Sequence, residues 1–219
     1  MCFPMELNME AELPPLEDTR RLTNTINRMI GILTNNGYSN RLPGLPEQGV
    51  AEWMQMLETN ILDEMRAWIA NPQMNRLETI FHRVQCWGGS SGRSIYVMGG
   101  GFENNFNLEA YEGIASTIAN NEVGDNYQNI CQTLFGYVNN IGRFGISFAT
   151  KHFCFWSRAA ESPLYLPIYD QILAREIMGV QQPRQQDYPT YCQNLIRYAQ
   201  LNGVTPYTAE RHLFNHFAG

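Results

Sequence analysis

Apolar residues recur at spacings of three and four along most of this 219-residue chain, and this helical period limits its fold more than any other feature. The first such run begins near Thr19, and Gly37 is a suitable stop for that helix. A strand pattern is confined to the short stretch Ile95-Tyr96-Val97. The sequence therefore predicts a mainly α-helical protein. The other expected helices cover 50–70, a stretch through Leu77 and Val84, 108–120, 127–138, 146–157, 171–178 and 188–201.

Little in the sequence divides the chain into parts. Glycines gather between Trp87 and Phe106, where we expect a connection rather than a helix, and their spacing does not match a phosphate-binding loop. Residues 1–18 carry five acidic side chains and no basic one, so we expect an acidic lead-in there. No repeat or linker interrupts the remainder. We therefore expect residues 19–219 to form a single helical domain with two lobes.

Composition and charge exclude several classes of protein. The five cysteines are widely spaced and form no CxxC pair, so we expect free thiols in a reducing cytoplasm and no metal site. No stretch reaches the roughly 18 apolar residues that a membrane helix needs. The net charge of −6 argues against a protein that coats nucleic acid, because nonspecific affinity comes mainly from basic side chains on phosphates. A compact DNA site made of a few arginines and a helix N-terminus is still compatible with this charge.

One lysine, Lys151, stands among fourteen arginines, and it follows a glycine-bearing turn. A glycine such as Gly145 lets the amides at the start of a helix approach a phosphate, and Arg143 in the same turn can contact phosphate directly. On the helix that follows, Ser147 and Lys151 lie one turn apart and are predicted to face a cleft between the lobes. The alternative is an ordinary turn and a surface lysine with no contact to DNA.

The carboxylate of Asp170 lies nineteen residues after this lysine, at the expected start of a helix that stops at Gly179. One interpretation is a plain N-cap that satisfies the free amides of the first helical turn. The other is a carboxylate that stabilises the positive charge growing on a sugar carbon as a glycosidic bond breaks, and that orients the attacking nucleophile. The two roles are compatible.

Residues 137–179 resemble the helix-hairpin-helix DNA glycosylases, most closely the bacterial branch similar to 8-oxoguanine DNA glycosylase. The resemblance rests on three stretches, which are Trp87-Gly88-Gly89-Ser90-Ser91-Gly92-Arg93, Ser147-Phe148-Ala149-Thr150-Lys151 and Leu166-Pro167-Ile168-Tyr169-Asp170. It implies a two-lobed helical fold with the hairpin motif at 137–157, and a monomer that acts on double-stranded DNA without a metal or cofactor. It also implies that a modified base is flipped out of the duplex and its N-glycosidic bond is cleaved.

The resemblance implies three sets of site residues. Asp170 and Lys151 are the implied catalytic residues. Arg143, Gly145 and Ser147 are implied to contact DNA. The expected base pocket consists of Trp87, Arg93, His152 and Phe155.

The identity of the nucleophile depends on how the motif is aligned. Alignment on Gly145 puts Ser147 where bifunctional members have the amine that forms a Schiff base, whereas counting back from Asp170 puts Lys151 there. With Ser147 in that position water is the nucleophile and an abasic site results, which we favour. With Lys151 the enzyme would also nick the strand.

The sequence does not determine which modified base is excised. The fold also resembles antiviral glycosylases that remove glucosylated 5-hydroxymethylcytosine from phage DNA, and an acidic chain fits selective attack on a rare base better than constant scanning of a genome. The alternatives are an 8-oxoguanine repair glycosylase with strand-nicking activity and, from another class, a noncatalytic helix-hairpin-helix DNA-binding module.

Overall fold

The computed structural model of the chain describes residues 19–46, 49–120 and 126–218, and within these ranges the protein is mainly helical and contains no strand. The acidic lead-in expected at residues 1–18 lies outside the described residues. Within the same ranges, no helix is both long and apolar enough to cross a membrane.

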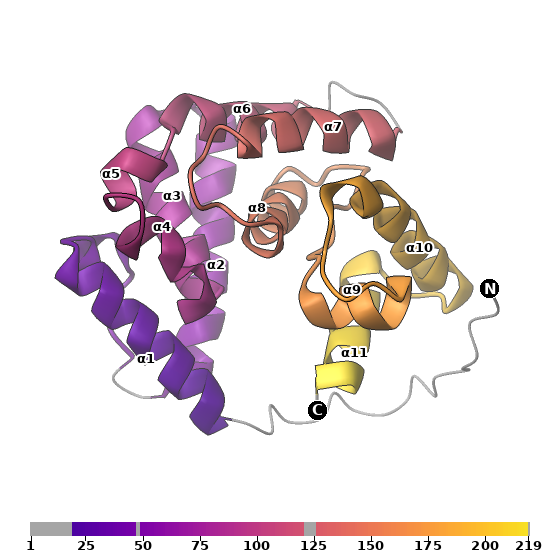
Figure 1. Ribbon diagram of the computed structural model, residues 1–219, viewed down its shortest axis with the longest axis horizontal. Coiled ribbons are helices and arrows are strands. Elements are labelled where there is room, and N and C mark those ends of the chain that lie inside the picture. Colours follow the sequence, from indigo (N-terminus) through magenta and orange to yellow (C-terminus); the bar gives the residue numbers. More distant parts are fainter. Residues whose placement is uncertain (1–18, 47–48, 121–125, 219) are drawn as a thin grey trace.

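The first half of the chain forms a group of helices on one side of the molecule, shown on the left in Figure 1. Two long helices, α2 and α3, pack against each other there, and α1 packs against both. The glycine-rich connection after α3 is folded into short helical turns. The elements of this half are α1 (Thr19–Asn35), η1 (Ser39–Arg41), α2 (Val50–Ala70), α3 (Met74–Trp87), η2 (Ser90–Arg93), α4 (Ser94–Val97) and α5 (Phe102–Asn105).

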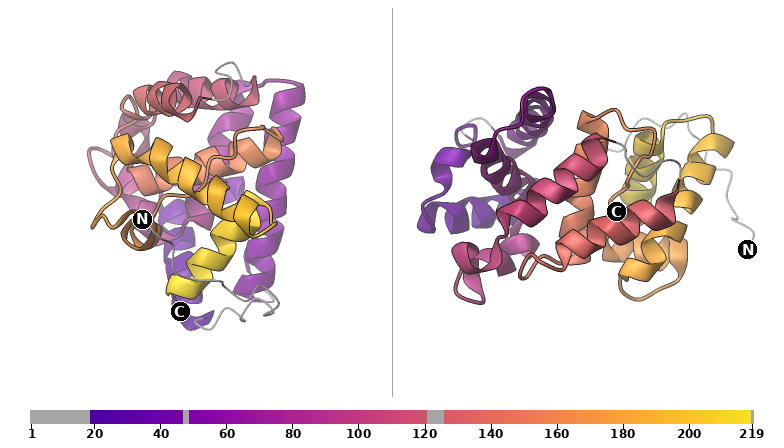
Figure 2. Two further views of the ribbon diagram at one scale, coloured as in Figure 1. Left: turned by 90° about the vertical axis from the view of Figure 1, so that its right-hand side faces the viewer. Right: turned by 90° about the horizontal axis from the view of Figure 1, so that it is seen from above.

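The second half surrounds and extends a central helix, α8. Figure 1 shows α9, α10 and α11 on the opposite side of α8 from α1, and Figure 2 shows α6 and α7 packed together across the top of the molecule. The elements are α6 (Leu108–Ala119), α7 (Tyr127–Val138), α8 (Ile146–Ala159), α9 (Gln171–Met178), η3 (Gln185–Asp187), α10 (Tyr188–Leu201) and α11 (Pro206–Ala218).

Helix α8 is buried on nearly all sides because helices from both halves of the chain cover it. It packs against α2 and α3 and also against α6. Ala149, Phe153 and Trp156 form one fully buried stripe of this helix. Beyond the first turn of α8, only Lys151 and Arg158 keep partial exposure. A helix that is apolar over most of its circumference is stable only in such a central position.

The strand expected at Ile95-Tyr96-Val97 is wrong, because these residues belong to the short helix α4. Ile95 and Tyr96 are both buried, and the Tyr96 hydroxyl lies 2.8 Å from Nδ1 of the buried His82. An isolated strand would leave buried backbone groups unpaired, whereas a helical turn pairs them locally. Sequence periodicity could not distinguish these outcomes over three residues.

The predicted free cysteines are confirmed for the four that are described, Cys86, Cys131, Cys154 and Cys192, all of which are buried. They contribute as small apolar residues to packing.

Candidate functional site

The glycine-rich connection packs directly onto the first half of α8. A Cβ atom added to Gly88 would collide with the Phe148 ring and would lie 3.0 Å from Cδ of Lys151. A Cβ added to Gly92 would collide with the same ring. These two glycines are therefore required by the close approach of the connection to α8, and they bring the stretch 87–93 to Lys151.

The segment that leads into Asp170 is extended, and side chains from several helices hold its backbone. In a helical protein such a segment has no neighbouring strand, so its buried N–H and C=O groups need other partners. The bonds are Tyr127 hydroxyl to Tyr165 oxygen (2.9 Å), Leu166 amide to Ser157 hydroxyl (3.3 Å), Tyr188 hydroxyl to Pro167 oxygen (2.7 Å), Tyr191 hydroxyl to Ile168 oxygen (2.8 Å) and Tyr169 amide to Thr150 hydroxyl (3.0 Å). The backbone that carries Asp170 is thus fixed from α7, α8 and α10.

Thr150 provides the direct link between this segment and the helix that carries Lys151. Its hydroxyl accepts the N–H of Tyr169 at 3.0 Å and donates to the carbonyl oxygen of Ile146 at 3.0 Å. The side chain is fully buried. Because Thr150 precedes Lys151 and Tyr169 precedes Asp170, this bond brings the backbones that carry the two predicted catalytic residues near each other.

We expect Thr150→Val to lower the free energy of unfolding by about 1–3 kcal/mol, because the buried N–H of Tyr169 loses its acceptor. Thr150→Ser keeps the hydroxyl and should lose much less of this free energy. Urea unfolding followed by circular dichroism measures the difference. Thr59→Val is the matched control, since Thr59 bonds in the same way to the Gln55 carbonyl oxygen but is exposed. Equal stability of the Val and Ser variants at position 150 would contradict the assigned role.

Asp170 is the N-cap of α9, as predicted. Its Oδ1 atom accepts the backbone N–H of Leu173 at 2.9 Å, and its own backbone is extended. Gly179 ends the helix in the left-handed conformation with φ +67°, which confirms the expected stop. One carboxylate oxygen of Asp170 thus accepts the capping hydrogen bond, and the Asp170 side chain is only partly buried.

Lys151 is half-buried on the side of α8 that faces this segment. Its Nζ atom donates to the carbonyl oxygen of Ser147 at 3.3 Å and lies 4.5 Å from the centre of the Phe148 ring. Burial lowers the pKa of Lys151, while the negative charges of Asp170 and Glu210 oppose that shift. Lys151 thus contacts the backbone of Ser147 and feels the charge of Asp170, and its amine deprotonates more easily than that of an ordinary lysine.

The turn before α8 has a left-handed backbone at Arg143. This residue is exposed and has φ +58°, a conformation that ordinarily favours glycine. The N-cap Gly145 has an ordinary φ of −70°, and a Cβ there would meet nothing within 4 Å. Gly145 is therefore not required by the packing of this chain.

The four residues predicted for a base pocket lie in different surroundings. His152 is fully buried, and its ring nitrogens lie 2.8 Å from the Tyr111 hydroxyl and 3.3 Å from Nε2 of Gln85. Burial lowers the pKa of His152 well below its usual value, so the ring is neutral.

Phe155 is also buried and packs edge-on against the partly exposed Trp87, with ring centres 5.0 Å apart. Arg93 is exposed and donates to the carbonyl oxygen of Ser90 at 3.1 Å. The accessible members of the predicted pocket are therefore Trp87 and Arg93.

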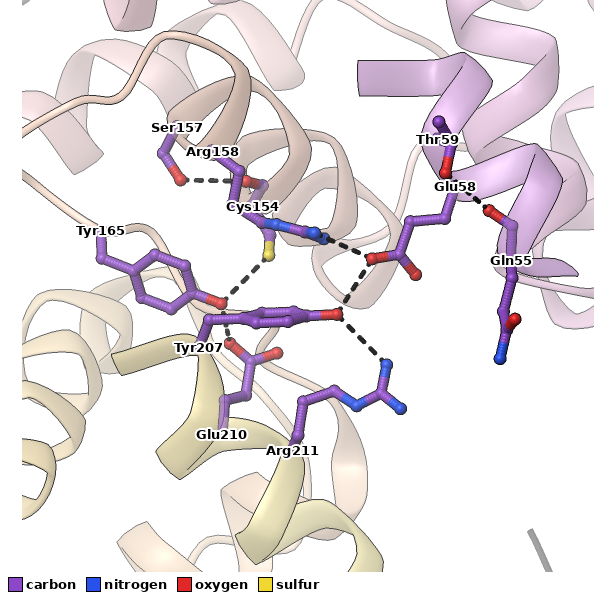
Figure 3. A network of polar contacts seen from close by, with 10 residues as sticks. All are labelled: Gln55, Glu58, Thr59, Cys154, Ser157, Arg158, Tyr165, Tyr207, Glu210 and Arg211. Atoms are coloured by element: carbon purple, nitrogen blue, oxygen red, sulfur yellow. Dashed lines mark hydrogen bonds and ion pairs between the residues drawn. The ribbon is translucent and has the colours of Figure 1, made fainter. Parts of the chain in front are cut away.

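Helix α11 adds a polar network that the sequence interpretation missed (Figure 3). Arg158 of α8 forms an ion pair with Glu58 of α2 at 2.8 Å, and the Tyr207 hydroxyl donates to the same Glu58 oxygen at 2.9 Å. The Tyr165 hydroxyl donates to Glu210 at 2.8 Å. This network joins α2, α8 and α11 to the segment before Asp170.

The sequence does contain a signal for α11. Thr205-Pro206 is a helix start, and the Thr205 hydroxyl accepts the N–H of Thr208 at 3.1 Å. Ala209 and Leu213 follow at a spacing of four and are buried.

No protein family model, no curated protein and no solved structure matches this chain.

Proposed function

We propose that this protein is a DNA N-glycosylase that flips a modified base out of the duplex and cleaves its N-glycosidic bond, leaving an abasic site. One observation carries the proposal. The three stretches on which the resemblance rests are distant in sequence, yet they meet around Lys151 and Asp170 through Gly88 and the Thr150–Tyr169 bond. A purely structural helical protein does not need its single lysine and a capping carboxylate to share such a site.

In the proposed reaction the bond between C1′ and the base nitrogen breaks, and its electron pair leaves with the base. The Asp170 carboxylate stabilises the positive charge that develops at C1′. Water then attacks C1′, and Asp170 orients the water and receives its proton. The segment 165–170 restrains the carboxylate in advance, so little reorganisation is needed when the charge forms.

The environment of Lys151 favours a second version of the same activity. A half-buried amine with a lowered pKa is a better nucleophile than an exposed lysine. In that version Nζ attacks C1′ in place of water, the resulting Schiff base undergoes β-elimination, and the strand is nicked. We favour the water mechanism, in which Lys151 positions phosphate or base.

The proposed substrate is glucosylated 5-hydroxymethylcytosine of phage DNA, and the alternative is 8-oxoguanine in a repair role. The net charge of −6 supports the first, because an acidic chain has little nonspecific affinity with which to scan a genome. A noncatalytic DNA-binding module is the remaining alternative, and it would bind DNA without cleaving either base.

The test uses labelled duplexes that carry one of the two bases, with half of each sample treated with hot alkali to cleave abasic sites. We expect cleavage of the glucosylated duplex only after alkali. Cleavage without alkali would establish the lyase version. DNA binding without cleavage of either duplex would instead favour the noncatalytic module.

We expect Arg143→Gly to change stability and DNA binding in opposite directions. Glycine relieves the left-handed strain, so the free energy of unfolding should rise by about 1 kcal/mol. Loss of one phosphate contact should weaken DNA binding and reduce the salt dependence of log Kd by about one. Thermal unfolding and fluorescence anisotropy at several salt concentrations measure the two effects. Arg28→Met, which removes an exposed charge from α1, is the control for DNA binding.

Unchanged DNA affinity in Arg143→Gly would remove this arginine from the proposed DNA surface.

A further inference from the structure

Glu210 is a buried carboxyl group behind the segment that carries Asp170. It lies on α11 and is only 5% exposed. Its Oε2 atom accepts the Tyr165 hydroxyl at 2.8 Å, and the backbone N–H of Ile168 also stabilises its ionised form. Figure 3 shows the carboxyl of Glu210 directed at the Tyr165 hydroxyl, which also lies 3.3 Å from Sγ of Cys154. Glu210 therefore contacts the segment at two points before Asp170.

We propose that Glu210 is a positioning residue for Asp170, which holds the segment 165–170 against α8 and so sets the place of the Asp170 carboxylate. The other side chains that bind this segment are hydroxyl groups, whose hydrogen bonds do not change between pH 6 and 9. Glu210 is the carboxylic acid of this set. The role of Glu210 in catalysis rests on the proposed glycosylase function, whereas its hydrogen bonds to the segment 165–170 do not.

The surroundings of Glu210 make this contact dependent on pH. The pKa of Glu210 is raised from its ordinary 4.5 to about 8, chiefly by burial; the negative charge of Asp170 contributes to the rise, whereas Tyr165, Ile168 and Arg158 oppose it. The folded form therefore holds a proton that the unfolded chain gives up near pH 4.5. The resulting stability is fully present below that pH and is lost as the pH rises through 8. The titratable and charged groups around it are Tyr165, Asp170, Lys151, Cys154, Arg158, Tyr191 and Cys192.

Ionisation of Glu210 places a second negative charge near Asp170 in a buried setting. Repulsion between the two carboxylates then favours a looser segment, because residues 165–170 belong to no helix and can move without unfolding one. Glu210→Gln keeps the shape and a hydrogen-bond acceptor for Tyr165 but cannot ionise. This variant should hold the segment equally well at every pH.

The first experiment measures amide hydrogen exchange of Ile168 and Tyr169 without DNA, corrected for the intrinsic rate. In the natural protein we expect protection to fall about tenfold between pH 7 and pH 9, as a single ionisation near pH 8 requires. In Glu210→Gln the protection should be constant. If Glu210→Gln fails to fold, Tyr165→Phe replaces it, and protection should then be low throughout. The same fall in the natural protein and in Glu210→Gln would overturn the proposal.

The second experiment measures the rate of base excision over the same pH range. We expect the natural rate to fall about tenfold between pH 7 and pH 9 and the Glu210→Gln rate to stay level. A purely structural role would lower the rate of the variant at every pH and leave its profile unchanged. Glu109→Gln, an exposed residue of α6, is the matched control. An inactive protein whose exchange follows the expected pattern would refute the glycosylase function and leave the positioning role of Glu210 standing.

Discussion

Asp170→Asn should lower the rate of base excision by about 100-fold or more while the protein keeps its stability. The amide removes the negative charge that stabilises C1′ and the base that receives a proton from water. Asn caps helices as well as Asp does, so the bond from the Leu173 N–H can be retained. Single-turnover cleavage assays with alkali and thermal unfolding measure the two quantities.

Two further variants separate the chemical and structural roles of Asp170. Asp170→Ala loses both roles, so it should be as inactive as Asp170→Asn and less stable by about 1 kcal/mol. Asp63→Asn removes an exposed carboxylate from α2 and should affect neither quantity. An Asp170→Asn protein that excises bases at the natural rate would leave Asp170 as a cap alone.

Lys151→Met should slow base excision by about 10- to 100-fold, the loss expected when one positioned charge is removed from a catalytic site. Methionine matches the length of the lysine stem and fits a half-buried site, so the variant should fold. It should also be at least as stable as the natural protein at neutral pH. Burial lowers the pKa of Lys151, so the unfolded chain binds the proton more tightly, and the natural protein gains stability as the pH rises toward 10.5. Thermal unfolding of both proteins between pH 7 and pH 10 measures this gain as a difference: the stability of the natural protein relative to Lys151→Met should rise with pH, because the ionisation of Glu210 affects both proteins alike.

The single lysine makes the choice of nucleophile easy to test. Borohydride reduces a Schiff base to a stable protein–DNA link, and Lys151 is the only side-chain amine in the sequence. With water as the nucleophile we expect no trapped complex. A complex that forms with the natural protein and is lost in Lys151→Met would replace the water mechanism by the lyase mechanism. Arg28→Met, which removes an exposed charge from α1, controls for general loss of DNA affinity.

Local sequence signals predicted a large part of the fold. The helices at 50–70, 127–138, 171–178 and 188–201 have the predicted bounds, because apolar period and breaking residues act within a few residues of one another. The cap at Asp170 and the stop at Gly179 were predicted for the same reason. Helix α11 was missed although Thr205-Pro206 marks its start, and the four residues of α4 were too few to show a helical period.

Parts of the candidate site depend on partners that are distant in the chain. The burial of His152 against Tyr111 and Gln85 could not be read from the α8 sequence, because it depends on α3 and α6. The same is true of Glu210, whose contact with Tyr165 spans 45 residues. Sequence patterns give the face of a helix on which a residue lies, but not the element that covers that face.

The amino-acid sequence by itself thus determined the helical class and the position of most helices. It also identified residues whose side chains could take part in a reaction, Lys151 and Asp170 among them. These follow from period, capping and side-chain chemistry, which are local properties. Only the tertiary structure decided that the stretches carrying these two residues pack together, that hydroxyl groups from three helices hold the segment before Asp170, and that Glu210 is buried behind it. The reason is physical, since burial and hydrogen bonding between distant residues arise only when the helices pack together.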